Sequence, residues 1–304
     1  MIIEKKALNQ MLYSRKLIYT NSAREAWGNI INIYKEENAG GKILLPSYVG
    51  WSSNEGSGIF DPVSKSGLEY EFYELDECLN INIEDLKKKT KETDNPMILI
   101  VHYFGFIDTN YDQITDWLID NKVFFVEDSA HAWLTDLLGG RCGRKGNYSF
   151  YSLHKLLPIS KGGFLVKNTP EDDIEKQDVS IFNLNYDLLS IYIKRRDNYK
   201  YLYGLLKEVE EIEILHHSLE DGICPQTFPI IIKNYNRDKL YHEMNQRSYG
   251  VVSLYHTMIN PLKASSSGAS FVLSKKIMNL PIHQDVKKEQ LDSMVSQLKR
   301  ILHV

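Results

Sequence analysis

Two side chains in the first half of the chain have the types and positions to act together on a ligand. Lys155 interrupts the apolar segment YSFYSLHKLLPISKGGFLV (148–166), and a glycine pair follows it. A lysine in such surroundings is costly unless its charge is neutralised, paired or used chemically. Asp128 ends the apolar run VFFVED, and His131 comes three residues later. An amine, a carboxylate and an imidazole are therefore candidates for one site.

Each of these residues also has a purely structural interpretation. Asp128 can cap the next turn with His131 packed beside it, and Lys155 can be a solvated loop lysine. Both residues nevertheless follow strand-like runs, and open parallel sheets bind ligands beyond the carboxyl ends of their strands. Pyridoxal phosphate needs an amine for its aldehyde, an anion for its ring nitrogen and a neighbour for its ring. Taken together, the three residues favour a pyridoxal phosphate site.

The segments that would position these residues alternate between strand-like and helix-like patterns. NPMILIVHYFG (95–105) and VFFVED (123–128) are continuous apolar runs, as expected of strands buried on both faces. YDQITDWLIDNK (111–122) between them is amphipathic, and REAWGNIINIYKEE (24–37) has helical spacing. KILLP (42–46) is another short apolar run. This alternation predicts an α/β fold with a mostly parallel sheet.

The pattern changes after about residue 190. Residues 191–212 are predicted to form one long helix, 224–233 a strand, 236–247 a helix and 288–302 a closing amphipathic helix. We therefore expect a large cofactor-binding α/β domain over residues 1–190 and a small α+β domain over residues 191–304.

The composition of the chain indicates which classes of partner are expected. The hydrophobic fraction of 43% and charged fraction of 25% are those of a globular protein, and the net charge of -4 argues against nucleic acid. The longest apolar run is too short to span a membrane, and the start has no secretory apolar region. The three cysteines are widely spaced and form no metal-binding pattern. We expect a reduced, cytoplasmic protein without a metal site.

Five segments, in order, resemble the DegT/StrS family of sugar aminotransferases, which are fold-type-I pyridoxal phosphate enzymes. FVEDSAHA (125–132) is similar to the family's cofactor strand. SLHKLLPISKGGFLV (152–166) resembles its lysine loop, in which six residues separate the lysine from a Gly-Gly pair, and this spacing selects Lys155 over Lys161. The other three segments are KILLPSYVGW (42–51), VHYFGFIDTNYDQITDWL (101–118) and MNLPIHQDVKKEQLDSMVSQL (278–298).

The resemblance implies roles for these residues. Lys155 would hold the cofactor's aldehyde covalently and move the proton during the reaction, and Asp128 would pair with the pyridine nitrogen. His131 would lie beside the ring oxygen. Ser152 would place its hydroxyl on the phosphate, unless it only bonds its own backbone at the strand end.

The phosphate seat implied by the resemblance is the segment NSAREAW (21–27), at the start of a helix. Free N–H groups of Ala23 and Arg24 would face the phosphate there, and the Arg24 guanidinium is a further candidate. The structural alternative makes Ser22 an N-cap and leaves Arg24 solvated.

The aromatic side chain that covers the cofactor ring is less well defined. The family's stacking residue lies four positions after the proline of the second segment, and that position is Gly50. Tyr48 and Trp51 compete for the role, with a slight preference for Trp51, while a core role remains open for either.

Three departures from the family pattern stand out. The region after FNLNYD (182–187) is shortened, which bears on substrate identity and dimer geometry. Ala23 replaces the usual glycine of the phosphate helix. Gly56 and Gly58 form either a loop over the site or a surface turn.

By resemblance, the activity would be transfer of an amino group from an amino acid, glutamate foremost, to a nucleotide-linked keto-sugar, in surface polysaccharide or aminosugar biosynthesis. A homodimer is expected. One alternative is dehydratase-like chemistry, although relatives that dehydrate sugars replace the lysine with histidine. The other is a shortened, non-catalytic relative that acts as a binding or regulatory protein.

Overall fold

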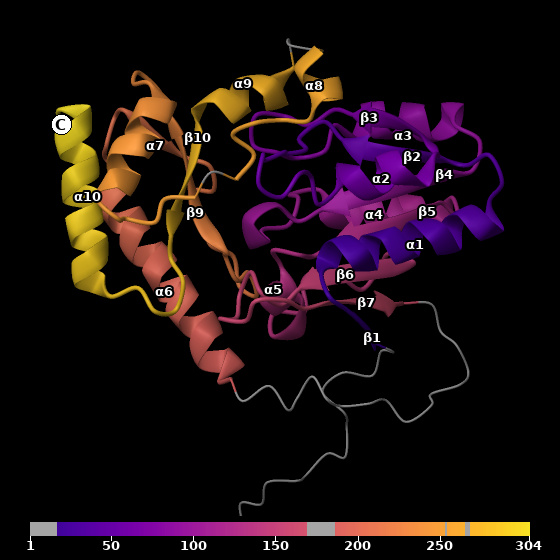
Figure 1. Ribbon diagram of the computed structural model, residues 1–304, viewed down its shortest axis with the longest axis horizontal. Helices are drawn as coiled ribbons and strands as arrows, with labels where there is room; N and C mark the ends of the chain where they lie inside the picture. The colour runs from indigo at the N-terminus through magenta and orange to yellow at the C-terminus, as the bar shows by residue number, and fades with distance from the viewer. Residues whose placement is uncertain (1–16, 169–185, 253, 265–267) are drawn as a thin grey trace, which may run out of the picture.

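A seven-stranded sheet forms the centre of the first part of the chain (Figure 1). The computed structural model describes residues 17–168, 186–252, 254–264 and 268–304. The strands lie in the order β1 (Leu17–Thr20), β7 (Gly163–Lys167), β6 (Tyr148–Ser152), β5 (Phe124–Asp128), β4 (Pro96–Val101), β2 (Lys42–Pro46) and β3 (Glu69–Tyr73). Pairing is parallel from β6 to β3, and β7 is antiparallel to β6 and β1. The predicted α/β fold with a mostly parallel sheet is confirmed.

Apolar packing between the sheet and its helices holds this part together. The helices are α1 (Ala23–Glu37), α2 (Phe60–Ser66), α3 (Ile83–Glu92), α4 (Tyr111–Asp120) and α5 (Trp133–Leu137). The buried face of α1 carries Trp27, whose ring stacks on Phe150 of β6 with centroids 5.6 Å apart. This contact seats α1 over the central strands, so that its first turn comes close to the end of β6.

A second, antiparallel sheet lies beside the first (Figure 1). Its order is β10 (Ile277–Pro281), β9 (Thr227–Ile232) and β8 (Ile212–Ile214). The remaining helices are α6 (Leu188–Leu206), α7 (Arg237–Gln246), α8 (Asn260–Ala264), α9 (Ala269–Lys276) and α10 (Lys288–Leu302). Helix α6 spans the predicted domain division at residue 190, and that division stays a prediction.

The long helix predicted over residues 191–212 is wrong at its end. Helix α6 stops at Leu206, and Ile212 begins strand β8. Ile212 and Ile214 are buried and Glu213 between them is exposed, which is a strand period of two rather than a helical one. The glutamates before them gave a helical composition, and pairing with β9 decided the strand.

One short segment joins the two sheets, and we call residues 254–259 the crossing segment. Just before it, the Val252 amide donates to the Asn279 carbonyl of β10 at 2.9 Å. Within it, Thr257 accepts from the Trp51 amide at 2.8 Å, and the Ile259 amide donates to Val49 at 3.1 Å. The crossing segment therefore lies alongside the loop that follows β2.

Candidate active site

Asp128 lies at the carboxyl end of β5 and is 6% exposed. Its Oδ1 accepts a hydrogen bond from the Ala130 amide at 2.9 Å, and no described cation forms an ion pair with it. Burial raises the pKa of Asp128 to about 6, although the Ala130 amide and the charges of His102 and Lys155 act in the opposite direction. A buried carboxylate of this kind needs a positive partner to remain ionised.

Lys155 lies in the tight loop between β6 and β7. The Leu153 amide donates to the Gly162 carbonyl at 3.0 Å, and the Leu157 amide donates back to Leu153 at 2.9 Å, which closes the loop around the lysine. Burial lowers the pKa of Lys155, while Asp128 and Glu55 raise it. No described carboxylate forms an ion pair with this amine. Its neutral form, the nucleophilic one, is therefore more accessible than in an ordinary lysine.

The relation between Asp128 and Lys155 is the central feature of the site. Lys155 lowers the pKa of Asp128, and Asp128 raises the pKa of Lys155, so the two groups lie within electrostatic reach. They are nevertheless not bonded to each other. Asp128 is buried and Lys155 is half-buried, and the two opposite charges remain apart. This arrangement fits a ligand between them that has a proton-bearing atom at one end and an electrophile at the other. The residues present therefore fit pyridoxal phosphate.

His131 follows Asp128 on the loop after β5 and is buried. Its Nδ1 accepts a hydrogen bond from the Phe104 amide at 3.3 Å, which places the ring proton on Nε2. Burial, reinforced by the charge of Lys155, lowers the pKa of His131 well below its usual range. The structure thus brings a neutral imidazole to the same end of the sheet as Asp128 and Lys155.

Ser152 and the start of α1 meet at Gly163. Ser152 is fully buried at the end of β6, and its partner on β7 is Gly163. A Cβ on Gly163 would lie 2.4 Å from the carbonyl carbon of Ser22 and 2.5 Å from the Ala23 nitrogen. Only glycine allows α1 to begin so close to the sheet.

The first turn of α1 has N–H groups available for an anion. Ser22 is the N-cap, and its hydroxyl accepts from the Glu25 amide at 3.2 Å. The N–H groups of Ala23 and Arg24 then have no intrahelical acceptor. Ser152, the cross-strand partner of Gly163, has its hydroxyl 3.2 Å from His154 Nδ1. The free N–H groups and this hydroxyl are the candidates for a phosphate seat.

The Arg24 guanidinium is engaged elsewhere. It donates to the Glu55 carbonyl and lies 3.5 Å from the Asp61 carboxylate. The backbone between Ser52 and Gly56 forms a tight turn, closed by amide–carbonyl bonds of 3.0 and 2.8 Å. Arg24 therefore holds this turn against the start of α1.

The two candidate aromatics lie in different environments. Trp51 is 44% exposed, with the Lys263 amine 5.8 Å from its ring centroid. Tyr48 is fully buried and stacks on Tyr255 with centroids 4.9 Å apart. The buried aromatic cluster near His131 thus includes Tyr48 and not Trp51.

Glu127 and His102 form a buried pair that the sequence reasoning missed. His102 Nε2 lies 2.9 Å from Glu127 Oε2, and Glu127 also accepts from Tyr111 and from the Gly143 amide. Burial alone would raise the pKa of Glu127, but His102 and the backbone amides lower it to about 2. One signal for Glu127 was present in the sequence. Side chains alternate along a strand, so Glu127 must point to the opposite face of the sheet from Asp128.

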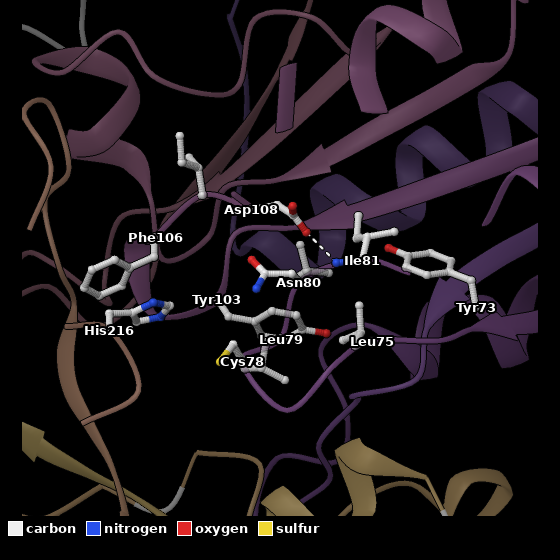
Figure 2. A pocket seen from close by; sticks show the side chains of 12 residues that line it. Tyr73, Leu75, Cys78, Leu79, Asn80, Ile81, Tyr103, Phe106, Asp108 and His216 are labelled. Atoms are coloured by element: carbon white, nitrogen blue, oxygen red, sulfur yellow. Dashed lines mark hydrogen bonds between the residues drawn. The ribbon is translucent and has the colours of Figure 1, made fainter. Parts of the chain in front are cut away.

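A cavity of about 550 Å³ opens beside Lys155. Arg195 of α6, also missed, lines it together with Gln226, Arg247 and His283. Another cavity, of about 20 Å³, lies near Asp108 and has room for about one water (Figure 2). There Asp108 accepts from the Ile81 amide at 2.5 Å, and His216 stacks on Phe106. Of these two cavities, the one beside Lys155 is large enough to admit a substrate.

Two features that the sequence analysis considered are not found in the described part of the chain. No group of three potential metal ligands occurs among the described residues. No described helix is long and apolar enough to cross a membrane.

Comparison with solved structures shows the same fold. A DegT DnrJ EryC1 StrS aminotransferase from Brucella abortus is 17% identical, with a TM-score of 0.73 over 94% of this chain and 85% of that one. Helicobacter pylori PseC, an aminotransferase involved in the biosynthesis of pseudoaminic acid, is 15% identical with a TM-score of 0.74 over 94% and 86%. The GDP-4-keto-6-deoxymannose-3-dehydratase ColD is 18% identical with a TM-score of 0.73 over 95% and 89%.

No curated protein matches the chain. The model of the DegT/DnrJ/EryC1/StrS aminotransferase family matches residues 6–183, which is more than half of the 304 residues. The match includes the strand that carries Asp128 and the loop that carries Lys155. The chain is therefore an enzyme that belongs to the DegT/DnrJ/EryC1/StrS aminotransferase family.

Proposed function

We propose that this enzyme binds pyridoxal phosphate between Asp128 and Lys155 and transfers an amino group from an amino acid, glutamate foremost, to a nucleotide-linked keto-sugar. The observation that carries the proposal is a pair of opposite, unbonded charges beyond the ends of β5 and β6, the buried Asp128 and the half-buried Lys155. Aminotransferases of this family depend on pyridoxal phosphate. When bound, the cofactor supplies an aldehyde and a ring that accepts electrons.

The residues around the cofactor have different proposed roles. Burial lowers the pKa of Lys155, so its amine gives up a proton more readily than an ordinary lysine and can act as the proton carrier. Asp128 would pair with the ring nitrogen and favour its protonated form. The Ser152 hydroxyl and the N–H groups of Ala23 and Arg24 bind the phosphate. His131, held neutral, lies beside the ring without adding charge.

The cavity beside Lys155 supports an anionic substrate. Arg195 is 2% exposed; it donates to the Gln226 carbonyl at 2.9 Å and to Gln284 Oε1 at 3.2 Å. Neither partner is charged, and burial lowers the pKa of Arg195. Arg195 thus has no negatively charged hydrogen-bond partner among the described residues, and a carboxylate or phosphate of the substrate would provide one. We propose that Arg195 binds the carboxylate of the amino acid donor.

Names of similar proteins support a sugar nucleotide as acceptor. The ColD structure was determined with bound GDP-perosamine, and PseC is involved in the biosynthesis of pseudoaminic acid. We propose a role in surface polysaccharide or aminosugar biosynthesis, and a homodimer as the working unit. The large exposed side chains of Leu189 and Ile193 on α6 are consistent with a subunit contact. The cytoplasmic location and the absence of nucleic-acid partners stay predictions.

Dehydration of a sugar is the second candidate, because ColD is among the similar structures. The amine of Lys155 favours transamination, since a lysine amine can both take up a proton and return it. Formation of 2-oxoglutarate from glutamate by the cofactor-loaded enzyme distinguishes the two. Dehydration without 2-oxoglutarate would exclude the aminotransferase assignment.

Covalent capture tests the site directly. After incubation with pyridoxal phosphate and reduction with borohydride, mass spectrometry is expected to find the cofactor on the peptide that contains Lys155. Lys155→Ala should lose this label and about a thousandfold in activity, because it removes both the covalent anchor and the proton carrier.

Lys161→Ala is the matched control. Lys161 lies in the same loop but is exposed, so its removal should leave the label in place. A label on Lys161, or a protein that stays colourless and unlabelled, would contradict the proposal. The latter result would favour a non-catalytic binding or regulatory role.

A further inference from the structure

Gly50 has no side chain, and Tyr255 occupies the space that a side chain there would need. A Cβ on Gly50 would lie 2.8 Å from Cδ1 and 3.2 Å from Cα of Tyr255. Gly50 also forms a β-bridge with Met258, so the two backbones run side by side. The missing side chain at position 50 is thus what allows the Tyr255 ring to enter.

The Tyr255 ring lies among residues of the candidate active site. It stacks on Tyr48 at 4.9 Å and meets Tyr103 edge to face at 5.4 Å. On the other side its centroid is 5.9 Å from that of Phe104 and 6.4 Å from that of His131. Burial, together with the nearby charge of Asp128, raises the pKa of the Tyr255 hydroxyl. The ring is therefore next to the position assigned to the pyridine ring.

The backbone at Tyr255 is held in an uncommon conformation. Its φ is 60°, in the left-handed region that a large side chain rarely adopts. Before this turn the Val252 amide is bonded to Asn279 of β10, and after it Thr257 and Ile259 are bonded to the loop after β2, so the chain is held on both sides. Strain that the surrounding structure maintains in this way points to a function for the residue.

We propose that Tyr255 is the aromatic side chain that covers the cofactor ring, an inference that rests on the function proposed above. It takes the place that the sequence analysis assigned to Trp51 or Tyr48. Trp51 is largely exposed, and Tyr48 supports Tyr255 from behind through the stacked pair. An electron-rich phenol ring stacks well on an electron-poor pyridine ring.

The test compares the dissociation constant of pyridoxal phosphate for the wild-type chain, Tyr255→Phe and Tyr255→Gly, measured from the cofactor's absorption and its induced circular dichroism. Glycine suits the left-handed backbone, so Tyr255→Gly removes the ring without adding strain. We expect Tyr255→Phe to bind within about twofold of wild type. Tyr255→Gly should bind about tenfold more weakly and show a smaller dichroic signal.

A double variant provides the rescue. In Gly50→Phe with Tyr255→Gly, a ring grows from the opposite backbone into the vacated space, and we expect most of the affinity to return. Tyr235→Leu, an aromatic loss outside the site, should not change the dissociation constant. Trp51→Leu should change it by less than about twofold, because the ring is exposed.

The opposite results are equally informative. Tighter binding by Tyr255→Gly would mean that the ring lies in the cofactor's own space, and unchanged binding would mean that it does not touch the cofactor; either overturns the proposal. A larger loss in Trp51→Leu than in Tyr255→Gly would overturn it as well. If the wild-type chain takes up no cofactor at all, the proposed function fails instead.

Discussion

At the scale of single residues, burial makes the charge of Asp128 costly to the folded chain. Its pKa in the folded chain is raised from 3.8 to about 6, so the folded state binds the proton more tightly than the unfolded state. The stability that comes from this proton is complete below pH 4 and is lost as the pH rises through 6. At neutral pH the cofactor-free enzyme therefore carries a buried negative charge that costs it stability.

Asp128→Asn removes this cost and keeps the bond to the Ala130 amide. We expect the cofactor-free variant to gain up to about 2 kcal/mol in unfolding free energy at pH 8 and almost nothing at pH 4. Urea unfolding at both pH values measures the difference. The same variant should bind pyridoxal phosphate more weakly. Asp94→Asn, on an exposed loop, serves as the control, and an equal gain at both pH values would rule out titration of Asp128 as the cause.

Some site residues could be identified from the sequence because the residues next to them along the chain indicate where they lie. Asp128 and Lys155 follow apolar strands, and the structure places both at the same end of the sheet. Arg195 and Tyr255 could not be found in this way. Each is defined by residues more than twenty positions away, such as Gln226 for Arg195 and Gly50 for Tyr255. Such pairings depend on tertiary packing, which periodicity does not record.

At the scale of elements, the contact between α1 and β7 decides whether the phosphate seat forms. Gly163→Ala would push its Cβ into the backbone of Ser22 and Ala23, and backbone cannot move aside as a side chain does. We expect a loss of about 3 kcal/mol in unfolding free energy and a weaker affinity for pyridoxal phosphate. Denaturant unfolding and cofactor titration measure the two effects.

Gly204→Ala is the matched control for this prediction. Gly204 lies inside α6, and no atom lies within 4 Å of a Cβ built there. Alanine should therefore raise stability by about 0.5 to 1 kcal/mol, because it favours the helix. If both variants lose stability to the same extent, the close approach at Gly163 is not the cause.

Elements with a clear apolar pattern were predictable, and elements without one were not. Helix α1 and strands β2, β4 and β5 lie where the apolar patterns put them. Strand β8 was missed because three residues cannot establish a period against a helical background of glutamates. Strand β1 was missed because its exposed Ile18 and Tyr19 give no alternation, and it is ordered by pairing with β7.

At the scale of the whole molecule, the substrate cavity has walls from both parts of the chain. Lys155 comes from the large sheet, and Arg195 from helix α6. We expect Arg195→Gln to raise the KM for glutamate about tenfold or more with a smaller change in kcat, because a charged hydrogen bond to the carboxylate is lost. Steady-state kinetics with varied donor and acceptor measure it.

Arg195→Lys should recover part of the affinity, since it restores the charge without the planar fork. Lys194→Gln, the neighbouring position on α6, should leave both KM values unchanged. A rise in the KM of the sugar acceptor alone would reassign Arg195 to the phosphates of the nucleotide. No change in either constant would contradict its role in binding.

The late position of the crossing segment in the sequence also determines when its contacts can form during synthesis. The ribosome makes the chain from its N-terminus, so Asp128 and Lys155 emerge long before the Thr257 and Ile259 bonds to the loop after β2 can form. A nascent chain that has folded only its large sheet therefore still lacks the packing of the crossing segment against the loop after β2, and with it the Tyr255 ring beside Tyr48.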